Sequence, residues 1–127
     1  SGTVPDAASI KLPKRIPYHI AMEMLLTGRW LDAAEAARWG LINQIHPADQ
    51  LLAKARDMAD LLAAGPPLVY AAIKEVVRDA EGARFQDTMN RITKRQLPTV
   101  DVLYGSEDNM EGFRAFAEKR DPVWKGR

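Results

Sequence analysis

The sequence predicts a mainly α-helical protein with one or two short β segments. Three observations lead to this prediction. Apolar residues recur at helical spacings of three, four, seven and eight positions along most of the chain after residue 17. Glycines, prolines and capping residues fall mostly between these periodic stretches, where they mark helix ends. One run, 41–46, alternates between apolar and polar residues in the manner of a strand.

The composition fits one domain and excludes several classes of protein. The chain has 127 residues, of which 46% are hydrophobic, and its net charge is +1. Nucleic acids and anionic membranes need a concentrated basic face, so neither is expected as a partner. The chain has no cysteine, which excludes disulfides and thiolate metal sites. It also lacks a bilayer-length apolar run and a signal peptide, and we therefore expect a cytoplasmic protein.

The first segment, 1–17, is expected to be a lead-in loop with at most a short turn of helix. It contains three prolines and a cluster of basic residues. A chain that opens on a turn, with no earlier element to pack against, suggests the remainder of something longer. Pro17 can then open a helix, because the first helical positions need no N–H donor. Residues 18–127 are expected to form the helical domain.

The run 25–45 contains two helix ends and a strand. Gly28 can end the first helix by adopting the left-handed conformation. Asp32 can cap the next helix, and Glu35 can reach back to the N–H of the cap in a reciprocal capping box. Gly40 closes that helix. The alternating run 41–46 is then predicted to be a short strand.

Two further helices follow from apolar spacing. The first covers 48–64, ends at Gly65, and has an apolar stripe that consists of Leu51, Ala55, Met58, Ala59 and Leu62. The second begins at Pro66 and continues to about Asp79.

After Gly82 the pattern predicts a longer helix from Ala83, with Pro98 inside it as a kink. Ser106 can cap the last helix. This helix has acidic residues in its first turn and is expected to carry Lys119 and Arg120 in its last turn, which is the charge order that a helix dipole favours.

Few side chains suggest chemistry. His19 and His46 lack carboxylates at ligand spacing, so no metal site is expected. The serines are not in a nucleophile elbow, and no glycine-rich loop follows a strand. Asp6 stands in a turn beside apolar residues, where a carboxylate can hold a proton for transfer. The simpler alternative is an aspartate that bonds the backbone of its own turn.

Phe116 and Lys119 form the best candidate binding pair. They are three positions apart, so they are neighbours on one helix face. An aromatic ring beside a cation can take the adenine and phosphate of a nucleotide-like ligand. The competing interpretation makes Phe113 and Phe116 core anchors and the cations helix-dipole partners, and the spacing alone favours it.

Six motifs together resemble a known family. They are Gly2-Thr3-Val4-Pro5-Asp6, Lys11-Leu12-Pro13, the run LLTGRWLDAAEAARWGLINQI, Pro47-Ala48-Asp49, Ser106-Glu107-Asp108 with Glu111-Gly112, and the ending FAEKRDPVWKGR. In this order, over residues 2–127, they resemble the enoyl-CoA hydratase/isomerase (crotonase) superfamily. The resemblance implies the C-terminal helical (trimerisation) part of the crotonase fold. The spiral core, the oxyanion hole and both catalytic glutamates would lie before residue 1, so this chain alone is expected to be inactive.

The resemblance also implies a function for the parent protein. It would be a lyase that adds or removes water across the α,β bond of an enoyl-CoA thioester, with coenzyme A as part of the substrate and no tightly bound cofactor. Phe116 and Lys119 match positions that contact coenzyme A. Asp6 matches a turn that lines the acyl pocket, although Ala8-Ser9 replaces the usual Gly-Gly after it.

The resemblance further implies self-association as a homotrimer or hexamer. Two alternatives to the lyase stay open. One is an enoyl-CoA or dienoyl-CoA isomerase of the same family, with Asp6 as the proton carrier. The other is a non-catalytic helical assembly module.

Overall fold

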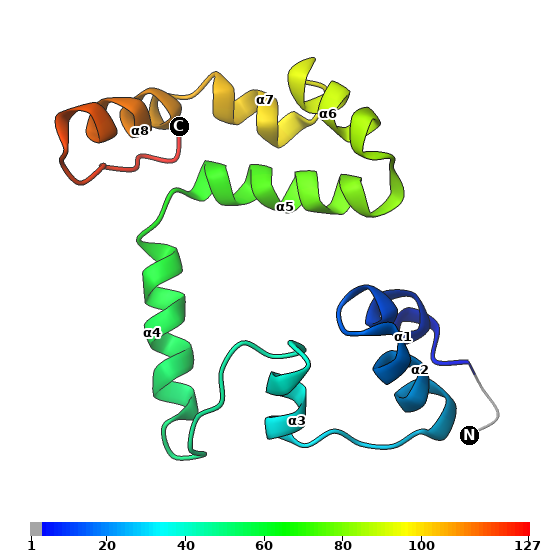
Figure 1. Ribbon diagram of the computed structural model, residues 1–127. Helices are drawn as coiled ribbons and strands as arrows, with labels where there is room; N and C mark the ends of the chain where they lie inside the picture. Colours follow the sequence, from blue (N-terminus) through cyan, green and yellow to red (C-terminus); the bar gives the residue numbers. More distant parts are fainter. Residues whose placement is uncertain (1–3) are drawn as a thin grey trace. The chain divides into compact units, whose positions relative to one another are not determined.

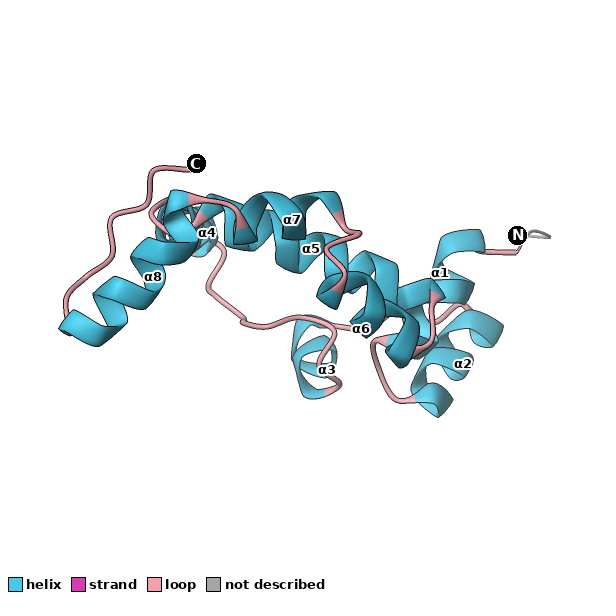
Figure 2. Cartoon of the chain, turned by 90° about the horizontal axis from the view of Figure 1, so that it is seen from above, coloured by secondary structure: helices cyan, strands magenta, loops and turns pink. Residues whose placement is uncertain are grey.

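The chain is built from short helices joined by loops (Figures 1 and 2). The structure is a computed structural model that describes residues 4–127, and this described part contains no strand. The elements are α1 (Asp6–Lys11), the 3-10 helix η1 (Leu12–Lys14), α2 (Tyr18–Thr27), α3 (Ala33–Arg38), α4 (Leu51–Ala63), α5 (Pro67–Gly82), α6 (Phe85–Thr93), α7 (Pro98–Tyr104) and α8 (Glu107–Glu118). They form two compact units, Ser1–Ala55 and Arg56–Arg127, and we describe each unit by itself.

The lead-in segment is more helical than the sequence predicts. Residues 6–14 form α1 and η1 instead of a loop. The prolines do not prevent this, because Pro5 lies at the N-cap of α1 and Pro13 in the first turn of η1, where a missing N–H costs no hydrogen bond. The core of the first unit consists of the buried Ile16, Ile20 and Ala21, with Leu12, Met24 and Trp39 packed against them.

The predicted end of α2 and start of α3 are confirmed, with one correction. Gly28 is left-handed, with φ of 69°, and its N–H donates to Met24 O. Asp32 Oδ1 accepts from Glu35 N at 2.7 Å, as a cap should. The Glu35 carboxylate, however, does not complete a capping box. It pairs with Arg29 through two bonds of 2.7 and 3.0 Å, and this ion pair lowers the pKa of Glu35.

The predicted strand 41–46 does not form. Gly40 ends α3 as expected, with φ of 74° and a bond from Leu41 N to Ala36 O of 2.9 Å. The residues that follow are loop. Leu41, Ile42 and Ile45 remain 38%, 36% and 51% exposed. An alternating pattern becomes a strand only when another strand pairs with it, and the described part of the chain supplies none.

Helix α4 forms where its apolar stripe predicts it, but it buries no residue. The three large side chains of the stripe, Leu51, Met58 and Leu62, are 56%, 45% and 51% exposed. We call the set Leu51, Ala55, Met58, Ala59 and Leu62 the α4 stripe. An amphipathic helix gains most of its stability from burying such a face. The α4 stripe is therefore a surface without a partner in the part of the chain that the structure describes.

The core of the second unit lies between α5 and α7. Ala72, Leu97 and Val100 are buried there, and Val76, Ile92 and Leu103 pack against them. The prediction of one kinked helix from Ala83 is wrong, because α6 and α7 are separate. Arg95 is left-handed after α6, with φ of 53°, and Pro98 opens α7 instead of kinking a helix.

Two carboxylates of α5 tie the later helices to it. Asp79 Oδ2 accepts from the hydroxyl of the buried Thr88 at 2.6 Å and from Arg91 Nη2 at 2.7 Å. The pair with Arg91 lowers the pKa of Asp79. Glu75 Oε2 accepts from the backbone N–H of Thr99 at 2.8 Å, in the first turn of α7. In residues 4–127, none of the helices has both the length and the apolar character that crossing a bilayer requires.

Candidate functional site

The candidate site lies at the C-terminal end of α8, so its geometry starts with that helix. Ser106 caps the helix as predicted, because its Oγ accepts from Asn109 N at 3.1 Å. Glu107 and Asp108 occupy the first turn. The expectation of two cations in the last turn is wrong, since α8 ends at Glu118 and both cations follow it.

Lys119 ends the helix in a left-handed conformation. Its φ is 54°, its N–H donates to Phe116 O at 3.3 Å, and the N–H of Arg120 donates to Ala115 O at 3.1 Å. These are the bonds of a Schellman motif, whose left-handed position usually holds glycine. A side chain in this conformation costs about 1 kcal/mol. The sequence thus places a lysine where the backbone favours a residue without a side chain.

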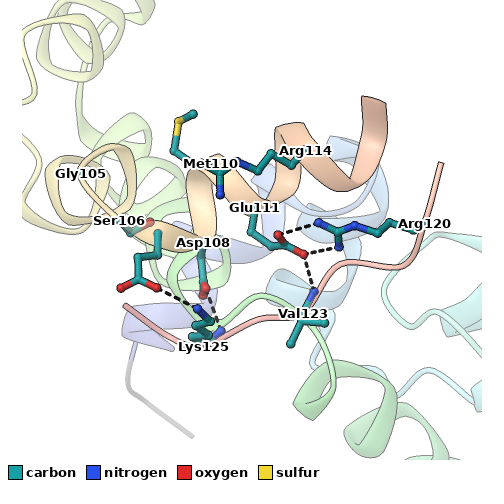
Figure 3. A pocket seen from close by; sticks show the side chains of 10 residues that line it. Gly105, Ser106, Asp108, Met110, Glu111, Arg114, Arg120, Val123 and Lys125 are labelled. Carbon is teal, nitrogen blue, oxygen red and sulfur yellow. Dashed lines mark hydrogen bonds and ion pairs between the residues drawn. The ribbon is translucent and has the colours of Figure 1, made fainter. Parts of the chain in front are cut away.

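The residues after Lys119 are held by a carboxylate of α8 (Figure 3). Arg120 Nη1 donates to Glu111 Oε1 at 2.6 Å, and Nη2 donates to Oε2 at 3.0 Å. Glu111 Oε1 also accepts from Val123 N at 2.9 Å. The Arg120 guanidinium and then the Val123 N–H lower the pKa of Glu111 from its ordinary value of 4.5 to about 2. Glu111 is therefore ionised at every pH well above that value.

A second carboxylate holds the end of the chain. Asp108 is only 2% exposed, and its two oxygens accept from Lys125 N and Gly126 N, each at 2.8 Å. The N–H of Asp108 donates to Arg127 O at 3.1 Å. We call Asp108, Glu111 and Arg120, together with the segment 121–127 that they hold, the tail clasp.

The tail clasp surrounds a depression of about 610 Å³ (Figure 3). Most of its charged walls bond to one another: Glu111 to Arg120, Asp108 to the backbone of Lys125, and the Lys125 ammonium to Glu107 at 3.0 Å. Arg114 also lines the depression, and its guanidinium makes no hydrogen bond or ion pair within residues 4–127. The bonded residues hold the end of the chain on α8, which is a structural role.

The two predicted binding residues lie beside the tail clasp and point into solvent. Phe116 is 88% exposed and Phe113 is 67% exposed, so the interpretation of these rings as core anchors is wrong for the described chain. Lys119 is exposed too. Within residues 4–127 its ammonium makes no hydrogen bond or ion pair. The structure thus leaves an exposed aromatic ring and a cation without a bonding partner in residues 4–127 three positions apart in the chain, at one helix end.

Asp6 lies in the first unit, and its local structure differs from the turn that the sequence predicts. It is the first residue of α1 and not part of an open turn, and it is exposed. Its neighbours Pro5 and Ala8 line a depression of about 680 Å³, but Asp6 does not. Phe116 and Lys119 belong to the second unit. Asp6 and the two binding candidates therefore belong to different units.

Reasoning from spacing missed the tail clasp. Glu111 and Arg120 are nine positions apart, and Asp108 and Lys125 are seventeen apart. No helical periodicity links such positions. The one signal was the resemblance, whose motifs include Ser106-Glu107-Asp108 with Glu111 and, separately, the ending that contains Arg120.

Comparison with known proteins identifies the class of protein. The model of the enoyl-CoA hydratase/isomerase family matches residues 1–127, and the chain belongs to this family. Among solved structures, enoyl-CoA hydratase subunit I from Geobacillus kaustophilus superposes with a TM-score of 0.86 at 34% identity, over 99% of this chain and 48% of that one. A putative enoyl-CoA hydratase/isomerase from Mycobacterium abscessus gives 0.83 at 37% identity, over 99% and 51%. The predicted fold class, the C-terminal helical part of the crotonase fold, is confirmed without its short β segments.

Among curated proteins, the chain is similar to carnitinyl-CoA dehydratases. The chain is 43% identical to that of Citrobacter koseri, over 99% of this chain and 49% of the relative, and 42% identical to that of Proteus mirabilis over the same shares. The segments Ala37-Arg38-Trp39-Gly40 and 121–127 already resemble these dehydratases. The chain spans about half the length of the curated relatives that it matches.

Proposed function

We propose that the whole protein is a lyase that adds or removes water across the α,β bond of an acyl-CoA thioester. The match of all 127 residues to the enoyl-CoA hydratase/isomerase family carries this proposal. The similarity to carnitinyl-CoA dehydratases supports dehydration and hydration in particular. In this proposal residues 1–127 bind coenzyme A and assemble the subunits, and the chemistry is done elsewhere in the whole protein.

The chemistry of such a lyase needs an anion to be stabilised. Removing a proton next to the thioester carbonyl produces an enolate, and backbone N–H groups aimed at its oxygen usually supply the largest catalytic contribution. Acid and base groups then move the proton and the water. We assign the oxyanion hole and both acid/base glutamates to parts of the whole protein outside residues 1–127, so this chain alone is proposed to be inactive.

Phe116 and Lys119 are proposed to hold the nucleotide end of the thioester. The Phe116 ring is 88% exposed and offers a flat face on which adenine can stack. The Lys119 ammonium follows one turn later and is a compact cation suited to a phosphate. No separate cofactor is needed in this proposal, because coenzyme A arrives as part of the substrate.

Subunit assembly is proposed to use the exposed apolar faces. The α4 stripe buries none of its residues in the described chain. Contiguous apolar surfaces of this kind mark interaction sites. We propose that this stripe packs in a homotrimer or hexamer.

The coenzyme A contact predicts the effect of one substitution. In the whole protein, Lys119→Ala should weaken binding of coenzyme A by about tenfold, because a charge-assisted bond to phosphate is lost. Isothermal titration at low salt measures this. Lys94→Ala is the matched control, since Lys94 is also an exposed lysine just after a helix end, and it should leave the affinity unchanged. An unchanged affinity in Lys119→Ala would refute the assigned contact.

Isomerisation is the second candidate, because the family description covers both reactions. Asp6 would then carry the proton, and its exposed carboxylate in the first turn of α1 is open to a ligand. The two reactions predict different results for Asp6→Asn. If the protein isomerises, the variant should lose proton exchange on a deuterium-labelled enoyl-CoA, measured by mass spectrometry. If it hydrates, as we propose, wild type and variant should exchange at similar rates.

A further inference from the structure

Two helices of the second unit are followed by a residue other than glycine in the left-handed conformation. Arg95 follows α6 with φ of 53°, and Lys119 follows α8 with φ of 54°. In both cases the next N–H reaches back five residues: Gln96 to Arg91 O at 2.8 Å, and Arg120 to Ala115 O at 3.1 Å. Glycine adopts this conformation more easily than either residue. A side chain at such a position therefore calls for an explanation beyond ending the helix.

The explanation for Arg95 lies within the chain. Its guanidinium stands 5.5 Å from the centre of the Tyr104 ring and 4.0 Å from Asp101 Oδ1. Lys119 makes no corresponding contact in residues 4–127. The Lys119 ammonium is therefore open to a ligand, as the proposed coenzyme A contact requires.

One carboxylate, that of Glu111, holds the residues that follow Lys119. Glu111 holds the Arg120 guanidinium with two bonds and the N–H of Val123 with a third (Figure 3). Arg120 is the residue directly after Lys119, and Val123 lies four residues beyond it. Glu111 itself is largely shielded from solvent, since only 19% of its side chain is exposed. Its contacts set where the chain goes after the left-handed turn.

We propose that Glu111 is a positioning residue for the coenzyme A contact of Lys119, acting through Arg120 and the backbone of Val123. This inference rests on the proposed function. A lysine ammonium sits on a long flexible stem, so its reach is set by the direction in which the backbone projects it. If the turn is free to relax, the ammonium must be ordered on binding, and affinity is lost.

The test is a titration of the whole protein with coenzyme A. Glu111→Gln keeps the shape and removes the charge, and Arg120→Lys keeps the charge and removes the two-pronged bond. Each should weaken coenzyme A binding by about fivefold to tenfold. Turnover of an enoyl-CoA should show KM raised by the same factor and kcat unchanged, because the contact is made equally in ground and transition states. Arg120→Lys continues the test if Glu111→Gln fails to fold.

A matched control separates positioning from general loss of charge. Glu118 Oε2 also accepts from Arg120 Nε, at 2.6 Å. In the described chain, however, Glu118 makes no bond to the segment 121–127. Glu118→Gln should leave coenzyme A affinity within about twofold of wild type, as expected for an exposed pair. An equal loss in Glu118→Gln and Glu111→Gln would overturn the positioning role.

The double variant provides a readout that a structural role would not change. If Glu111 acts through Lys119, then adding Glu111→Gln to Lys119→Ala should weaken coenzyme A binding no further. Losses that multiply in the double variant would overturn the inference. So would Lys119→Ala weakening binding while Glu111→Gln does not, and that result leaves the proposed function intact. Unchanged affinity in Lys119→Ala refutes the contact itself and the inference with it.

Discussion

Asp108→Ala is expected to lower the free energy of unfolding by about 2 to 4 kcal/mol and to release the end of the chain. The wild-type carboxylate is 2% exposed and accepts from two backbone N–H groups, those of Lys125 and Gly126, at 2.8 Å each. Alanine would leave both donors without a partner and a small cavity beside them. Urea denaturation of the whole protein gives the energy.

Hydrogen exchange shows where the Asp108→Ala variant loosens. The amides of Lys125 and Gly126 should exchange faster, while those of the α5 and α7 core should follow only the global loss. Glu107→Ala is the control at the preceding position, since Glu107 contacts Lys125 and Arg127 only through exposed ion pairs and the substitution should change stability little. Equal effects of the two substitutions would contradict the role of Asp108 in the tail clasp.

Leu62→Glu is expected to break the proposed assembly into single subunits. Leu62 lies in the α4 stripe and is 51% exposed in the described chain. If the stripe is buried between subunits, the substitution places an unpaired carboxylate in an apolar interface. This should weaken association by at least about a hundredfold. Size exclusion with light scattering measures the mass of the particle.

The same substitution at a neighbouring leucine is the control for Leu62→Glu. Leu61 is 67% exposed but lies about 100° around the helix from Leu62, off the α4 stripe. Leu61→Glu should leave the assembly intact. If Leu62→Glu also leaves it intact, or if both variants dissociate alike, the α4 stripe is not the interface.

Helix ends were predictable because they depend on local chemistry. Gly28 and Gly40 adopt the left-handed conformation that only their missing side chains make easy, and Asp32 and Ser106 accept from the first turn of their own helices. The strand at 41–46 was not predictable in this way. Its alternating pattern is local, but its formation depends on a distant partner.

The candidate site likewise has features that local sequence predicts and features that depend on distant contacts. Phe116 and Lys119 were singled out because residues three positions apart share a helix face, although α8 ends at Glu118 and Lys119 follows it in the left-handed conformation. The exposure of Phe116, which removes the core-anchor interpretation, depends on what packs against α8 and cannot be obtained from spacing. The left-handed turn at Lys119 was also missed, because a lysine gives no signal for a conformation that usually requires glycine.

The most direct measurement is a structure of the whole protein with a coenzyme A thioester bound. We predict adenine stacked on Phe116, a phosphate oxygen within hydrogen-bond distance of Lys119 Nζ, and Glu111 still bonded to Arg120 and Val123. A nucleotide that binds against another surface, with Phe116 and Lys119 still in solvent, would contradict the account.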